Sequence, residues 1–113
     1  MTEESVKRPV GKRSKTLSAL IKAFCLDYKT RNIHISRKNV SRRVRMEYEY
    51  INGRIFDGAA EIVGAENAEV FIDEIGNSIG YANSAIPYYS EKVYKQLKQE
   101  AADNIARKLH LLD

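Results

Sequence analysis

The chain has 113 residues, of which 43% are hydrophobic and 30% are charged, and this composition excludes an intrinsically disordered protein and a chain of two full domains. Cys25 is the only cysteine, which excludes an intramolecular disulfide and a metal centre built on several cysteines, and no apolar run is long enough to span a bilayer. We therefore expect one cytoplasmic domain with no membrane partner.

The net charge of +4 is unevenly distributed along the chain. Residues 29–45 contain no acidic side chain and seven basic ones, which are Lys29, Arg31, Arg37, Lys38, Arg42, Arg43 and Arg45. Residues 46–77 contain eight acidic side chains and a single basic one, Arg54. Because a basic block attracts phosphate and an acidic block is repelled by it, the contrast favours nucleic acid as the partner of the basic side.

The folded domain is expected to begin near residue 14. Residues 1–13 are rich in Lys, Arg and Ser with few apolar side chains, which is typical of a disordered basic arm. The stretch "SKTLSALIKAFCLDYKTRN" then places apolar residues at spacings of three and four, which predicts a first helix with Ser14 or Thr16 as its N-cap. The domain should therefore cover residues 14–113.

Residues 41–63 fit two different secondary structures. Apolar and charged side chains alternate from residue 44 to 50 and Asn52-Gly53 follows, which is typical of a β-hairpin and would give an α+β fold. An apolar stripe at helical spacing runs through the same residues and covers more of them. We predict one long helix over about 41–63, ended by Gly64, and keep the hairpin around Asn52-Gly53 as the alternative.

Two more helices are predicted before the chain ends. The stretch "AENAEVFIDEIGNSIG" should form a third helix that stops at Gly80, and "YANSAIPYY" should be a connector because it contains the turn and breaker residues Asn83, Ser84 and Pro87. Ser90 is a good N-cap for a last helix. The expected fold is all-α, a single small domain of about four helices.

The last helix is expected to have one apolar and one polar side. Its apolar stripe consists of Val93, Leu97, Ala101, Ile105 and Leu109, and is widened by Tyr94, Ala102 and Leu112. Its polar side consists of Lys92, Lys95, Gln96, Gln99, Asp103 and Arg107. The apolar side should pack on the core, which leaves the polar side free to bind.

The sequence contains no cluster of reactive groups that would indicate an enzyme. His34 and His110 are far apart in sequence and lie in no metal-binding motif, and Cys25 falls on the apolar stripe of the first helix. Asp73 and Glu74 are adjacent on a helix, so they point in different directions and are interpreted as part of a solvated face. No catalytic residue, metal site or cofactor is therefore expected.

The candidate DNA-binding residues form two groups. Lysine contacts phosphate and glutamine hydrogen-bonds purine edges in a major groove, which suggests Lys92, Lys95, Gln96 and Gln99 on the last helix. The basic block supplies Arg37, Lys38, Arg42, Arg43 and Arg45. A merely solvated helix face and a solubilising loop are the alternatives for the two groups.

The C-terminal third of the chain resembles small phage-encoded transcription regulators of Gram-positive bacteria, of the ArpU, RinA and late-regulator type. The resemblance rests on "SEKVYKQLKQEAADNIARKL", with "FIDEIGNSIGY" standing where the first helix of a helix-turn-helix stands. It implies a helix-turn-helix-like C-terminal part and sequence-specific DNA binding in a bacterial host cell, with Tyr88 or Tyr89 touching the DNA backbone. The segment from Gly80 to Tyr89 is longer than the usual turn of about 3 to 4 residues.

A homodimer fits DNA binding because one short helix rarely gives enough specificity, although no heptad seam supports it.

The resemblance leaves two other functions open. The main alternative function is a small phage or mobile-element protein that binds a host or phage protein through its acidic, tyrosine-rich surface at residues 46–77. A packaging protein that binds DNA without sequence preference is the other. The sequence identifies neither an operator nor a partner.

Overall fold

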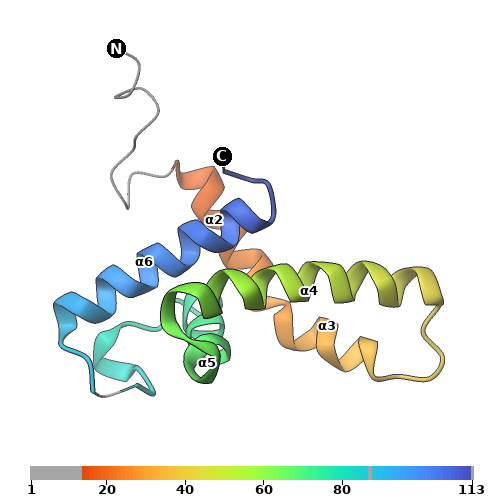
Figure 1. The fold of residues 1–113 in the computed structure, drawn as a ribbon, viewed down its shortest axis with the longest axis horizontal. Coiled ribbons are helices and arrows are strands. Elements are labelled where there is room, and N and C mark those ends of the chain that lie inside the picture. The colour runs from red at the N-terminus through yellow and green to blue at the C-terminus, as the bar shows by residue number, and fades with distance from the viewer. Residues whose placement is uncertain (1–13, 87, 113) are drawn as a thin grey trace, which may run out of the picture.

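The computed structural model describes residues 14–86 and 88–112, and these residues form helices joined by turns (Figure 1). In chain order the elements are α2 (Lys15–Leu26), α3 (Tyr28–Ile35), α4 (Arg42–Val63), α5 (Ala65–Gly76), a 3-10 turn η1 (Tyr81–Asn83) and α6 (Glu91–Lys108). The prediction of an all-α single domain is confirmed. The expected basic arm at residues 1–13 and the breaker Pro87 lie outside the described residues.

The first predicted helix is two helices, α2 and α3, separated only by Asp27. Ser14 is the N-cap of α2, and its hydroxyl accepts a hydrogen bond of 3.0 Å from the Leu17 amide. Beyond Asp27 the chain continues as α3, which packs against α4, whereas α2 packs against α5. The break at Asp27 lets each half bury its apolar side against a different helix.

The long helix α4 is continuous from Arg42 to Val63, so the hairpin alternative is wrong. Ser41 caps its N-terminus and Gly64, at φ 88°, ends it, as the sequence predicted. Asn52 does not form a turn with Gly53. It is only 4% exposed and joins α4 to α3. Its amide nitrogen donates to the Tyr28 carbonyl at 2.9 Å, and its oxygen accepts from Arg31 Nε at 2.6 Å.

Helix α6 lies across α4, where the two backbones approach closely at Gly58 (Figure 1). A Cβ atom placed on Gly58 would lie 2.8 Å from the Ile105 Cα atom. The Asn104 side-chain amide donates to the Gly58 carbonyl at 3.0 Å, which fixes the same crossing. The C-terminal half of α6 is therefore anchored on the central helix.

The buried side of α6 departs from the predicted stripe at Val93, whereas Tyr94 is buried as expected. Tyr94 is 1% exposed and stacks on Phe71, with their ring centroids 5.6 Å apart, while Val93 is 42% exposed. Farther along, the predicted Ala101 and Ile105 are fully buried. Asp103 was expected on the polar side and is instead only 6% exposed, so this expectation is wrong. The aromatic ring, rather than the smaller valine, fills the space beside α5.

Helix α5 ends at Gly76 and not at the predicted Gly80. A Cβ on Gly76 would lie 2.6 Å from the Leu26 amide nitrogen, so α5 and α2 touch closely at this point. Residues 77–90 connect α5 to α6, and this segment is longer than the turn of a compact helix-turn-helix, as the sequence indicated.

Glu74 holds the connector in place. The prediction that it belongs to a solvated face is therefore wrong. It is 2% exposed and accepts hydrogen bonds from the Ser84 hydroxyl at 2.8 Å, the Ala85 amide at 2.7 Å and the Tyr94 hydroxyl at 2.6 Å. A buried carboxylate requires such partners, and here they tie the connector and α6 to α5. The orientation of α6 thus depends on a buried polar cluster.

Within residues 14–86 and 88–112, none of the helices combines the length and the apolar character needed to cross a membrane.

Candidate nucleic-acid interface

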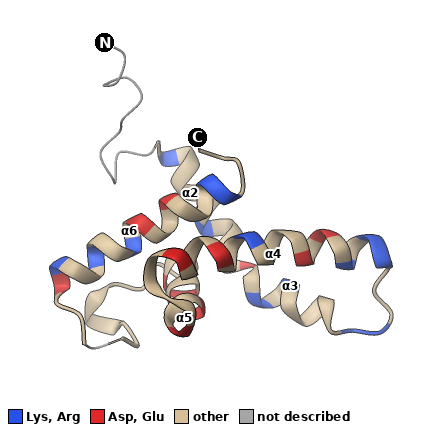
Figure 2. Cartoon of the chain, viewed as in Figure 1, with Lys and Arg blue, Asp and Glu red and all other residues tan. Residues whose placement is uncertain are grey.

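Most of the basic block lies in the turn between α3 and α4 and in the first residues of α4, at one end of the molecule (Figure 2). We call this surface the basic tip, and it consists of Arg37, Lys38, Arg42, Arg43 and Arg45. The α3 end is closed by Ser36, whose hydroxyl donates to the Ile33 carbonyl at 2.7 Å, and α4 starts at its Ser41 cap. Local capping therefore presents the basic residues at a protruding end.

Little negative charge offsets the basic tip. The first turn of α4 contains no acidic residue, so the positive end of the helix dipole adds to the charges of Arg42 and Arg43. Glu47 lies 3.6 Å from Arg43, but both side chains are exposed, at 88% for Arg43 and 57% for Glu47. An exposed pair of this kind is weak and exchanges readily with an incoming phosphate.

Arg45 differs from the rest of the tip because it is half-buried and holds the turn. Its Nη2 donates to the Arg37 carbonyl at 2.6 Å, across the loop between the helices. Its Nε is buried and has no hydrogen-bond partner among the described residues. Arg45 thus orders the loop that carries Arg37 and Lys38, which are both exposed.

Two residues of the basic block lie away from the tip. Lys29 pairs with Asp73 of α5 at 3.5 Å. Arg31 is 8% exposed, bonds Asn52 and the Phe24 carbonyl, and lies over the Phe24 ring. Burial lowers the pKa of the Arg31 guanidinium from its usual range, opposed by the charge of Asp27. Arg31 is therefore a structural cation between α2, α3 and α4.

The second candidate surface is the exposed side of the first turns of α6, which we call the α6 face. Lys92, Lys95, Gln96 and Gln99 are all exposed, as expected. Lys95 pairs with Glu91 at 2.8 Å and Gln96 donates to Glu100 at 3.1 Å, both within the helix. These exposed contacts must open before either side chain reaches a ligand, and they cost little to open.

The nine candidate residues do not form one surface. The α6 face and the basic tip lie at opposite ends of the longest axis of the molecule, which measures 50 Å (Figures 1 and 2). The distribution of charge along the sequence could not show this separation, because it depends on how α6 crosses α4.

The tyrosines contribute less surface than the sequence suggested. Tyr94 is buried, and Tyr81 is half-buried, with its hydroxyl donating to the Tyr89 carbonyl at 2.9 Å. Tyr88 is 68% exposed and lies beside the α6 N-terminus, with its hydroxyl on Asn67 at 3.0 Å. Of the two tyrosines considered for the DNA backbone, Tyr88 is the accessible one.

Two of the groups considered for chemistry, Cys25 and His34, are packing residues, and His110 is exposed. Cys25 is 3% exposed, and burial raises the pKa of its thiol to about 12, so the reactive thiolate is suppressed. His34 packs edge-on against Tyr48, with ring centroids 5.9 Å apart. In the part of the chain that the structure describes, no group of three or more His, Cys, Asp or Glu side chains is arranged to hold a metal ion.

Two lysines beside the α6 face, Lys22 and Lys98, were not among the predicted binding residues. Lys22 is on α2 and, together with Lys98 and Gln99, lines a groove between α2 and α6. The contact between these two helices joins residues about 80 positions apart in the chain, and no local pattern signals it.

No family model, curated protein or solved structure matches this chain.

Proposed function

We propose that the protein binds DNA and acts as a transcription regulator of the phage or prophage type. The basic tip would attract the DNA backbone, and the α6 face would contact base edges. The N-terminal turns of α6 are free of core contacts except at Tyr94 and the partly buried Leu97 and Lys98, which leaves one side of the helix open to a major groove.

The observation that carries the proposal is the uncompensated charge of the basic tip. Four exposed cations, Arg37, Lys38, Arg42 and Arg43, surround the positive end of a 22-residue helix, with Glu47 as the sole ion-pair partner among the described residues. A stable monomer gains nothing from this repulsion, whereas a polyanion binds there with release of counterions.

A protein partner at the acidic surface is the second candidate function. Glu66 and Glu69 are exposed on α5, and the exposed Tyr88 is bonded to the same helix through Asn67. A tyrosine next to acidic side chains suits a basic protein surface. The burial of Glu74 and Tyr94 removes two of the side chains that this interpretation would use.

The salt dependence of DNA binding tests the proposal. Each phosphate contact contributes about 0.9 to the slope of log K against log salt concentration, so Arg42→Ala and Arg43→Ala, made singly, should each lower the slope by about 0.9. Arg107→Ala is the matched control, because it removes one charge from a side chain that is also exposed but lies in the last turn of α6. Equal slopes for the tip and control variants would refute the role of the basic tip.

Base reading by α6 requires a different measurement. Gln96→Ala and Gln99→Ala should reduce the preference for one DNA sequence over others and leave nonspecific affinity nearly unchanged. If instead substitutions at Glu66 and Glu69 abolish a protein complex while the glutamine variants behave as wild type, the second candidate function replaces the first.

A further inference from the structure

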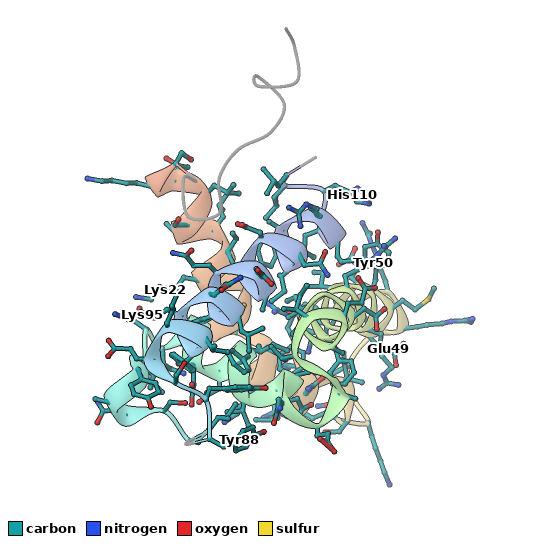
Figure 3. All side chains as sticks on the ribbon, turned by 60° about the vertical axis from the view of Figure 1, so that its left-hand side comes forward. Lys22, Glu49, Tyr50, Tyr88, Lys95 and His110 are labelled. Atoms are coloured by element: carbon teal, nitrogen blue, oxygen red, sulfur yellow. The ribbon has the colours of Figure 1, made fainter. Side chains whose placement is uncertain are left out.

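A groove of about 330 Å³ lies between α2 and α6, outside both candidate surfaces except for Gln99 on its rim. Buried apolar side chains, among them Ile21 and Ala102, form part of its lining. The polar lining comes from α2, the start of the connector and α6, as Ser18, Lys22, Ser78, Lys98 and Gln99. Figure 3 shows Lys22 of α2 and Lys95 of α6 on the same side of the molecule.

The groove is positively charged, because its lining contains two lysines and no carboxylate. Lys22 is exposed and makes no ion pair with a described residue. The charge of Glu74 counteracts the lowering of the Lys98 pKa by burial, but Glu74 does not line the groove. Lys22 is therefore the lysine of the groove whose charge no ion pair with a described residue offsets.

Lys98 is fixed within the groove wall. Its ammonium donates to the Ile79 carbonyl and lies 5.8 Å from the centre of the Tyr94 ring. Burial lowers the pKa of Lys98, and the charge of Glu74 opposes that shift. An ammonium has three N–H donors, so one bond to Ile79 leaves donors for a ligand. A preorganised, partly desolvated cation of this kind binds an anion more strongly than a fully solvated one.

We propose that this groove binds a phosphate group of the nucleic-acid backbone, with Lys22 and Lys98 as the cations. The inference rests on the proposed function and adds a site to it. A phosphate held here would lie beside the α6 face, so it would fix the helix against the DNA while Lys92 and Gln96 approach the bases. Backbone contacts of this type position a protein on DNA without reading sequence.

The test compares three single substitutions in the full chain. Lys22→Ala should lower the slope of log K against log salt concentration by about 0.9, and Lys22→Arg should restore it. Lys29→Ala is the control, because it removes the same charge from an exposed side chain, 75% accessible, that lines a different groove. Lys22 is exposed, so its replacement leaves the core intact. A slope for Lys22→Ala equal to that of the control would overturn the inference.

Backbone amide NMR shifts provide a second readout that separates the two proposals. Addition of a DNA duplex should shift the Lys22 and Ser78 signals, which come from groove residues outside the α6 face, and inorganic phosphate alone should shift them only at much higher concentration. If DNA binds and these signals do not move, the groove site is wrong while the proposed function stands. If DNA does not bind but inorganic phosphate shifts the signals, the proposed function fails and the groove is a site for a small anion instead of for nucleic acid.

Discussion

Two glycines of α4 should respond in opposite ways to the same substitution. Gly53 is exposed, and a Cβ placed on it has nothing within 4 Å, whereas a Cβ on Gly58 would lie 2.8 Å from the Cα and 2.9 Å from the amide nitrogen of Ile105. Both positions lie in the interior of the same helix. The pair therefore separates helix propensity from the α4–α6 contact.

Gly53→Ala should raise the free energy of unfolding by about 1 kcal/mol, which is the difference in helix propensity between the two residues. For a domain of this size the melting temperature should rise by roughly 4–8 °C. A hairpin turn at Asn52-Gly53 would require a positive φ at the glycine, so alanine would be destabilising there. Thermal unfolding followed by circular dichroism measures the change.

Gly58→Ala gains the same propensity but forces a methyl group against backbone atoms, which no side-chain rotation relieves. Overpacking of this kind costs about 1–3 kcal/mol, and contact with backbone atoms favours the upper value. After the gain of about 1 kcal/mol in helix propensity, we expect the free energy of unfolding to fall by about 2 kcal/mol. Stabilisation of both variants would refute the close α4–α6 approach, and destabilisation of Gly53→Ala would refute the continuous helix.

Three further predictions concern buried polar groups. Asn52→Ala should lower the free energy of unfolding by about 3 kcal/mol, because it leaves the buried Nε of Arg31 without an acceptor, and denaturant unfolding measures this. Cys25 should be unreactive to a thiol reagent at neutral pH in the folded protein and reactive after unfolding, since burial raises its pKa to about 12; rapid modification without denaturant would contradict the burial. Burial and the neighbouring Glu74 carboxylate raise the pKa of Tyr94 to about 12 from 10.0, so its contribution to stability is complete below pH 10 and declines between pH 10 and 12. Tyr94→Phe should make unfolding less sensitive to pH in that range, and an unchanged pH profile would contradict the Tyr94–Glu74 contact.

The sequence predicted the helix limits best where capping chemistry is local. Ser14, Ser41 and Ser90 each cap the helix that follows, and Gly64 ends α4 at the expected residue. The apolar stripe at helical spacing also correctly predicted a helix rather than a hairpin over α4. The break at Asp27 was missed, because no glycine or proline marks it and it depends on which helices α2 and α3 pack against.

The polar residues of the interior could not be predicted from local patterns. Glu74, Asn52 and Asp103 are of residue types that are usually exposed, and each is buried by the packing of the helices. The candidate binding residues were all placed at or near the surface, but their division into two ends of the molecule depends on the α4–α6 crossing. The position of Lys22 in the groove between α2 and α6 likewise depends on helix packing and could not be predicted from the sequence.

The most direct test of the central claim is a selection of fragmented genomic DNA on the purified protein at about 0.15 M salt, followed by sequencing of the retained fragments. We predict enrichment of one short motif, reduced when Gln96 and Gln99 are both replaced by Ala. Uniform retention would contradict sequence-specific reading by α6, and the absence of any retention would contradict DNA binding altogether.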